Sequence, residues 1–188
     1  MASHRQRQKP PLLVALAHQL AFVNGFEGSC DARVGRLLRT LTALARGKAL
    51  DLGTGFGVSA AWMLDGLGVD RTLVTVDVRA ERCERVQPLF SPFANVTLLC
   101  GDWREALSHG PFGIAFVNAA PAKAQGVDDV VAALRIGSLV VLDGVPTVPR
   151  GRNERDAWWQ SWTRHPRLTA SELAIADDRN VVIATRVR

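Results

Sequence analysis

Short apolar runs alternate with amphipathic stretches along most of this chain. Five runs are apolar without alternation, as is typical of strands buried on both faces of a parallel sheet, namely 49–52, 73–78, 96–100, 114–118 and 139–142. The stretches between and after them have helical spacing and predict helices over 58–67, 80–90, 103–108, 123–135 and 154–164. This alternation predicts an α/β fold with right-handed crossovers and helices on both faces of the sheet.

The two ends of the chain differ from this pattern. Residues 169–175 and 181–187 are both rich in β-forming residues, and the segment between them is too short for a crossover helix. They therefore predict a hairpin whose last strand is antiparallel. At the other end, helical spacing predicts helices over 12–23 and 31–46, with Asp31 as the N-cap of the second.

These elements divide the chain into a tail and one domain. Residues 1–11 are polar and basic and predict a mobile tail, whereas 12–188 predict a single domain. Within it, 12–46 supply the N-terminal helices and 47–188 a Rossmann-like core.

Composition narrows the class of protein only slightly. Hydrophobic residues make up 47% and charged residues 22% of the chain, as in ordinary globular proteins. The net charge of +5 comes from scattered basic residues, so a nucleic-acid partner is not expected. The apolar run 12–23 is too short to span a membrane. Cys30, Cys83 and Cys100 have neither disulfide nor metal spacing, which favours a reducing, cytoplasmic location.

A glycine-rich turn follows the first predicted strand, with Gly53, Gly55 and Gly57 in G-x-G-x-G spacing. Dinucleotide sites have G-x-G-x-x-G instead, and the carboxylate of Asp51 would repel a pyrophosphate. It would attract the ammonium group of a methionine moiety, while Ser59 at the helix start can donate to the methionine carboxylate. The turn therefore predicts S-adenosylmethionine as the ligand and makes a dinucleotide oxidoreductase the least favoured class.

Two further carboxylates follow the next two strands. Asp77 can accept hydrogen bonds from both ribose hydroxyls, Asp102 can accept from the adenine amino group, and Trp103 offers an aromatic face. Carboxyl ends of parallel strands meet at one edge of a sheet, so these side chains should share a crevice. The predicted cofactor-binding residues are Asp51, Gly53, Thr54, Gly55, Gly57, Ser59, Asp77, Val78, Asp102, Trp103 and Asn118.

From about residue 27 to the C-terminus, the chain resembles class I S-adenosylmethionine-dependent methyltransferases. The group it most resembles is the small O-methyltransferases related to catechol O-methyltransferase. The matching segments are 52–59, 74–77, 101–103, 139–145 and the final hairpin, and 25–29 correspond to a segment that covers the cofactor. The resemblance implies a seven-stranded, mostly parallel methyltransferase sheet, methyl transfer to an oxygen of a small molecule, and a homodimer.

The resemblance also implies a metal site, which this chain has lost in part. Metal-binding members use an Asp after the fourth strand and an Asp-Asn pair after the fifth, with a lysine base just after the first Asp. Here Asn118 and the pair Asp143-Gly144 stand at those positions, and Pro121 replaces the lysine. One carboxylate and one amide make a poor Mg²⁺ site, so no metal is expected, with Asp143 as the one weak candidate.

The catalytic candidates are Asn118, Asp143 and Lys123. Lys123 lies two residues past the expected base and can swing into the site, although a lysine at a helix start is more often solvated. Trp158, Trp159 and Trp162 can wall an acceptor pocket or, as we favour, pack a helix onto the sheet.

Three functions remain open from the sequence. The leading one is an O-methyltransferase without strong metal dependence. The changes at Asn118, Pro121 and Gly144 also fit a catalytically reduced S-adenosylmethionine-binding partner. An RNA methyltransferase fits the net charge but lacks the expected loop after the fourth strand.

Overall fold

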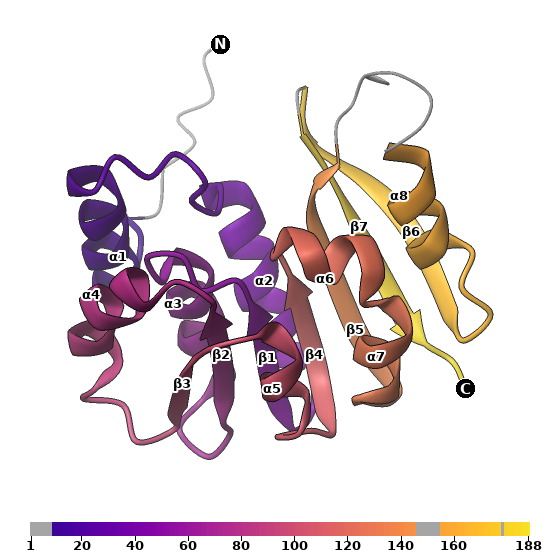
Figure 1. Ribbon diagram of the computed structural model, residues 1–188, viewed down its shortest axis with the longest axis horizontal. Helices are drawn as coiled ribbons and strands as arrows, with labels where there is room; N and C mark the ends of the chain where they lie inside the picture. The colour runs from indigo at the N-terminus through magenta and orange to yellow at the C-terminus, as the bar shows by residue number, and fades with distance from the viewer. Residues whose placement is uncertain (1–8, 146–154, 178) are drawn as a thin grey trace, which may run out of the picture.

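The computed structural model describes residues 9–145, 155–177 and 179–188, which form one seven-stranded sheet flanked by helices (Figure 1). The strands are β1 (Lys48–Leu52), β2 (Leu73–Asp77), β3 (Val96–Cys100), β4 (Phe112–Val117), β5 (Leu134–Val145), β6 (Leu168–Ala176) and β7 (Arg179–Arg186). The helices are α1 (Leu12–Val23), α2 (Ala32–Leu44), α3 (Val58–Leu67), α4 (Ala80–Phe90), α5 (Trp103–Leu107), α6 (Ala120–Gln125), α7 (Val127–Ala132) and α8 (Arg155–Thr163).

The strand order explains where a ligand can bind. The sheet runs β3-β2-β1-β4-β5-β7-β6, so the chain winds outward from β1 to β3 and then returns to place β4 on the other side of β1. β1 to β5 are parallel, and β7 pairs antiparallel with both β5 and β6. The predicted fold class and the antiparallel last strand are both confirmed. The reversal between β1 and β4 opens a crevice at the carboxyl ends of the strands.

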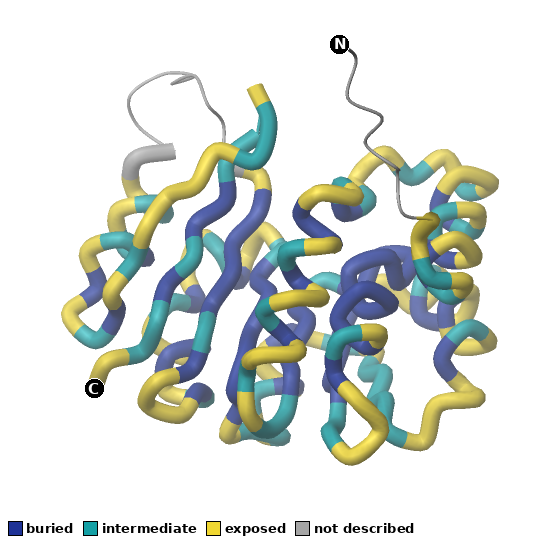
Figure 2. The backbone as a smooth tube through the Cα atoms, turned by 180° about the vertical axis from the view of Figure 1, so that it is seen from behind, coloured by how far each residue is buried: buried dark blue, intermediate teal, exposed yellow. Residues whose placement is uncertain are grey.

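Each face of the sheet carries its own apolar core. Helices α1 to α4 cover one face, where Val34, Leu38 and Met63 are fully buried. Helices α5 to α8 cover the other face, where Trp162 and Val130 are fully buried. The central strands accordingly lie in the buried interior of the molecule (Figure 2). Because both faces are covered, the strands read as continuous apolar runs rather than alternating ones.

The sequence prediction is wrong in the segment 123–135. The structure has two short helices there, α6 and α7, which meet at Gly126. A Cβ at this glycine would lie 2.7 Å from the Trp103 ring, so the glycine allows α5 to pack closely against the break. The fifth strand, predicted over 139–142, already begins at Leu134 and is longer than expected.

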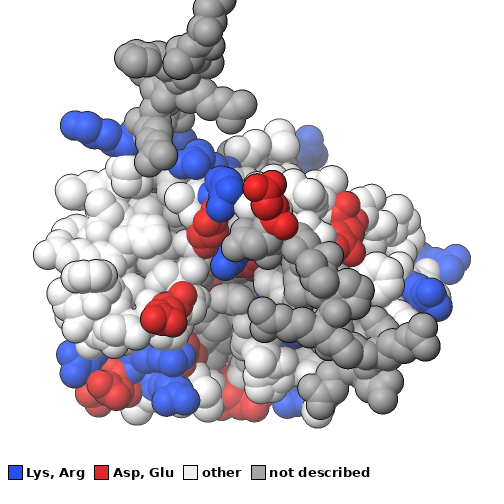
Figure 3. All heavy atoms as spheres, turned by 90° about the horizontal axis from the view of Figure 1, so that it is seen from above, with Lys and Arg blue, Asp and Glu red and all other residues white. Residues whose placement is uncertain are grey.

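Residues 1–8 of the predicted mobile tail and residue 154 of the last predicted helix lie outside the described residues. In the part of the chain that is described, no helix combines the length and apolar character needed to cross a membrane. The view from above looks onto the carboxyl edge of the parallel strands, where acidic and basic side chains lie interspersed (Figure 3).

Candidate functional site

A cavity of ≈ 530 Å³ lies at the carboxyl ends of the parallel strands. The glycine loop after β1 and the residues that follow β2, β3 and β4 supply most of its wall, and residues 26 and 28–30 supply another part. The volume is typical of a small-molecule site, and its position is the crevice that the strand order creates. The structure therefore brings three predicted motifs to one cavity, namely the glycine loop, Asp77 and the pair Asp102-Trp103.

The glycines of the loop have different roles. Gly53 and Gly55 line the cavity with φ of +109° and +54°, a backbone region that L side chains rarely adopt. Gly57 is not among the lining residues, and its role in cofactor binding stays a prediction. A Cβ there would lie 2.8 Å from Val86 and Phe90, so this glycine is required by the packing of α4 against the loop.

Asp51 lies behind the cavity wall and is fully buried. Its carboxylate accepts hydrogen bonds from Ser59 Oγ at 3.1 Å and from Thr75 Oγ1 at 2.8 Å, and Thr75 Oγ1 lies 2.6 Å from Thr54 Oγ1. Desolvation raises the pKa of Asp51 to about 7, although the Thr75 and Ser59 hydrogen bonds oppose this rise.

Ser59 lines the cavity between Asp51 and the solvent. The sequence predicts that its hydroxyl donates a hydrogen bond to a ligand carboxylate. In the structure, the hydroxyl donates to Asp51 instead. A hydroxyl that donates on one side offers lone pairs on the other. Asp51 and Ser59 together therefore favour a cationic group at this point of the cavity.

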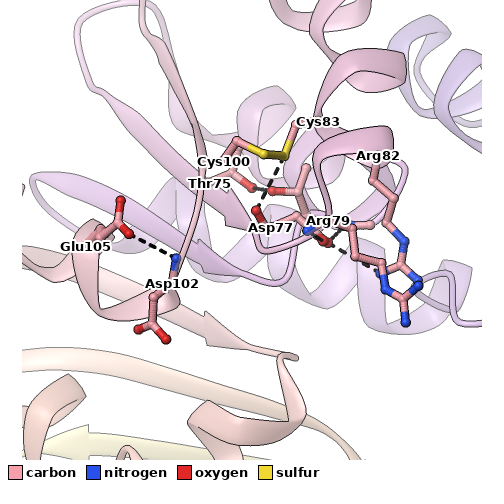
Figure 4. The surroundings of a disulfide bond; sticks show 10 residues. Thr75, Asp77, Arg79, Arg82, Cys83, Cys100, Asp102 and Glu105 are labelled. Carbon is pink, nitrogen blue, oxygen red and sulfur yellow. Dashed lines mark hydrogen bonds and ion pairs between the residues drawn. A yellow bond between two sulfur atoms is a disulfide. The ribbon is translucent and has the colours of Figure 1, made fainter.

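Asp77 ends β2 and is held by backbone donors. Gly55 N donates to its Oδ2 at 2.8 Å and Arg79 N to its Oδ1 at 3.0 Å, while the Arg82 guanidinium lies 3.6 Å from Oδ2 (Figure 4). Asp77, its exposed neighbour Val78 and both arginines line the cavity. The remaining lone pairs of the oriented carboxylate can accept hydrogen bonds from a pair of hydroxyl groups.

Asp102 lines the cavity after β3, but its carboxylate also stabilises the start of α5. It accepts from Arg104 N at 2.8 Å, and Glu105 completes a capping box by accepting from Asp102 N. Trp103 is buried against the core, and the Arg104 guanidinium lies 4.3 Å from the centre of its ring system. One face of the indole is thus covered, so stacking of a ligand base on Trp103 stays a prediction.

A disulfide joins Cys83 of α4 to Cys100 at the end of β3, with their Cα atoms 5.9 Å apart (Figure 4). The prediction that the cysteines have no disulfide partner is wrong, because α4 packs beside β3 and brings together residues that are separated by 17 positions. The Cys83 sulfur also lies 3.4 Å from the carbonyl oxygen of Asp77. The disulfide therefore supports the same corner of the cavity as Asp77.

Four charged or polar groups gather where β4, β5 and β7 end or begin. Lys123 Nζ of α6 donates to Asn118 Oδ1 at 3.1 Å and to the Asp143 carbonyl oxygen at 2.6 Å. The buried carboxylate of Asp143 accepts from Arg179 Nη1 at 3.0 Å and from Gly144 N at 2.6 Å. Burial lowers the pKa of Lys123 to about 8. Lys123 is not among the lining residues, but it contacts Asn118 of the cavity wall. The prediction that it is solvated, as lysines at helix starts usually are, is therefore wrong.

The predicted cofactor-covering segment 25–29 supplies Phe26, Gly28 and Ser29 to the cavity wall. Cys30 and Arg82 also line the cavity, and the sequence did not single them out. The rings of Phe26 and Phe56 meet edge to face with centroids 5.3 Å apart, and the Arg82 guanidinium lies 4.7 Å from the Phe26 centroid. Cys30 is buried beside the cavity, and desolvation raises the pKa of its thiol well above the ordinary value. Arg82 carries no sequence signal of its own, since only the fold brings α4 against Phe26.

The tryptophans of α8 have a structural role, as favoured from the sequence. Trp162 is fully buried and donates from Nε1 to the Lys123 carbonyl oxygen at 2.8 Å, while Trp159 donates to Glu172. None of the three, Trp158 included, lines the cavity. They hold α8 against the sheet and against the helix that carries Lys123.

The sheet and the cavity at its carboxyl edge define the Rossmann-like fold of class I methyltransferases. The O-methyltransferase TomG of Streptomyces achromogenes, solved with S-adenosylmethionine, shares this fold with a TM-score of 0.81, 21% identity and coverage of 96% of this chain and 92% of that chain. The O-methyltransferase of Bacillus cereus, solved with S-adenosylhomocysteine, has a TM-score of 0.80 at 17% identity, with coverage of 96% and 94%.

Relatives by sequence have names of the same kind. A Mycobacterium avium (strain 104) protein, provisionally named an O-methyltransferase, is 32% identical over an alignment of 139 positions, with coverage of 69% of this chain and 62% of that protein. The chain therefore spans less than two thirds of the length of the curated relatives it matches. No protein-family model matches the chain.

Proposed function

We propose that this protein transfers a methyl group from S-adenosylmethionine to an oxygen atom of a small molecule. The observation that carries the proposal is the joining of the glycine loop, Ser59 and Asp77 around one cavity at the carboxyl edge of a methyltransferase-type sheet. The names of the sequence relatives and the ligands of the structural neighbours support it.

Each part of the cavity suits one part of the cofactor. The backbone of Gly53 and Gly55 allows close approach of the methionine moiety, and Ser59 accepts from its ammonium group. Asp77 accepts from the ribose hydroxyls, and the segment around Asp102 borders the base. S-adenosylmethionine supplies an electrophilic methyl group on its sulfonium sulfur, so the protein need only position an oxygen nucleophile in line with it.

Calorimetry of the full chain with S-adenosylhomocysteine tests the cofactor assignment. The variant Asp77→Asn should bind 10-fold to 100-fold more weakly, since it weakens hydrogen bonds to a charged acceptor that are worth about 1.5–3 kcal/mol. Asp70→Asn is the matched control, because Asp70 is exposed and precedes β2 at the opposite edge of the sheet. Absence of binding to the wild type at millimolar ligand, or equal binding by Asp77→Asn, would refute the assignment.

Transfer of a tritiated methyl group to a panel of hydroxylated small molecules then tests catalysis. Binding without turnover on any acceptor would favour the role of an S-adenosylmethionine-binding partner instead. A homodimer, a cytoplasmic location and the lack of a nucleic-acid partner stay predictions.

A further inference from the structure

The residues at the expected metal position do not fit a divalent ion. Asn118 Oδ1 accepts from Lys123, and the two carboxylate oxygens of Asp143 accept from Gly144 N and Arg179 Nη1. Gly144 offers no side-chain ligand. A hard divalent cation needs several oxygen ligands, and here each available oxygen already faces an N–H donor. Within the described ranges, no group of three or more His, Cys, Asp or Glu side chains is arranged to hold a metal.

Two side-chain cations stand at this position instead. The Lys123 ammonium bridges the Asn118 side chain and the Asp143 carbonyl oxygen, and therefore lies between the ends of β4 and β5. Arg179, at the start of β7, pairs with the Asp143 carboxylate at 3.0 Å. The cluster thus holds two cations, of which Arg179 alone pairs with the one carboxylate, so it keeps a net positive charge.

Both cations have hydrogen-bond donors to spare. An ammonium has three N–H groups and a guanidinium has five, of which the described residues engage two on Lys123 and one on Arg179. Asn118 lines the cavity, and the Arg179 side chain is 34% exposed. Gly144 is exposed, and a Cβ there would lie 3.6 Å from Lys123 Nζ. Among the described residues, Lys123 Nζ is the one atom within 4 Å of that Cβ position, so position 144 places no side chain over the ammonium.

We propose that Lys123 and Arg179 replace the divalent cation and bind the acceptor through a single ionised hydroxyl, a phenolate or an enolate, rather than through a vicinal diol. The inference rests on the proposed methyl-transfer function. A metal ion chelates two adjacent hydroxyls because it has several coordination positions on one centre. N–H donors on two separate side chains can converge on one oxyanion, which needs no second hydroxyl.

The reaction balances without a metal. The acceptor hydroxyl loses its proton to solvent water on binding, and the two cations stabilise the oxyanion. A lone pair of this oxygen forms the new bond to the methyl carbon while the sulfur–carbon bond breaks and its electron pair stays on sulfur. An anion and a sulfonium thus become a neutral ether and a thioether, so the cluster favours the charged reactant and releases the neutral product.

A matched pair of probes, 4-nitrophenol and 4-nitrocatechol, tests the acceptor class with the full chain saturated with S-adenosylhomocysteine. Phenolate absorbance reports binding and the apparent pKa of the bound probe. We expect 4-nitrophenol to bind as the phenolate with its apparent pKa lowered by one unit or more, equally with EDTA or with Mg²⁺. The variants Lys123→Met and Arg179→Gln should each weaken this binding at least 10-fold.

Two controls remove the same charge elsewhere. Lys48→Met alters a partly buried lysine that donates to His109 O, and Arg85→Gln alters an exposed arginine of α4. Both should bind 4-nitrophenolate as the wild type does. Tighter binding of 4-nitrocatechol on adding Mg²⁺, unchanged binding by both site variants, or no phenolate binding at millimolar probe would overturn the inference. Calorimetry with S-adenosylhomocysteine on every variant separates these outcomes from misfolding and from failure of the proposed function.

Discussion

Replacing Asp51 by asparagine should change how the stability of the protein depends on pH. Asp51 is fully buried, and desolvation raises its pKa from 3.8 to about 7. Between these values the folded state holds a proton that the unfolded state has released. The stabilisation is therefore complete below pH 4 and is lost as the pH rises through 7.

The size of the effect follows from the two pKa values. The full difference corresponds to about 4 kcal/mol, of which about 3 kcal/mol falls between pH 5 and pH 8. Asp51→Asn cannot titrate but keeps the size of the side chain and one carbonyl acceptor for Ser59 or Thr75. The free energy of unfolding of the wild type, minus that of the variant, should thus fall by about 3 kcal/mol over this range.

Urea unfolding followed by tryptophan fluorescence at four pH values between 5 and 8 measures this difference. Subtracting the variant removes the contribution of the other groups that titrate in the same range, because they are common to both proteins. Parallel pH profiles of the wild type and the variant, within about 0.5 kcal/mol, would refute the reasoning. They would show that the carboxylate is ionised throughout and that Ser59 and Thr75 compensate for its burial.

Three further changes test other parts of the structure. Burial lowers the pKa of Lys123 to about 8, so from pH 8 to pH 10 the unfolded state holds a proton that the folded state has released. The free energy of unfolding of the wild type, minus that of Lys123→Met, should therefore rise by about 2 kcal/mol over this range, and equal urea profiles would contradict this. Replacing Cys83 and Cys100 by serine should lower the free energy of unfolding by about 3 kcal/mol in oxidising buffer only, and a loss that persists in dithiothreitol would argue against the disulfide. Gly57→Ala should lower the thermal midpoint well below that of Gly137→Ala, since both glycines have positive φ but only the first has neighbours within 4 Å of a new Cβ.

The apolar runs were sufficient to predict the fold. A strand covered on both faces must be apolar throughout, and a segment too short for a crossover helix forces the last strand to be antiparallel. The glycine spacing and Asp77 likewise indicated the site, because parallel strands end at one edge of the sheet. Among the described helices, most boundaries lie within two residues of the predicted ones. The exception is the segment around Gly126, where close packing against Trp103 favours a break between two helices.

Contacts between segments far apart in the sequence decided which side chains pair within the site. Lys123 and Arg179 approach Asp143 because α6 and β7 flank the end of β5. The spacing of these residues along the chain does not predict this contact. The same holds for the Cys83–Cys100 pair, which depends on how α4 packs beside β3. Local sequence thus determined the sheet and the edge where a ligand can bind. Which charges meet at that edge, and hence what chemistry they can support, depended on tertiary packing, because their partners lie on elements far apart in the chain.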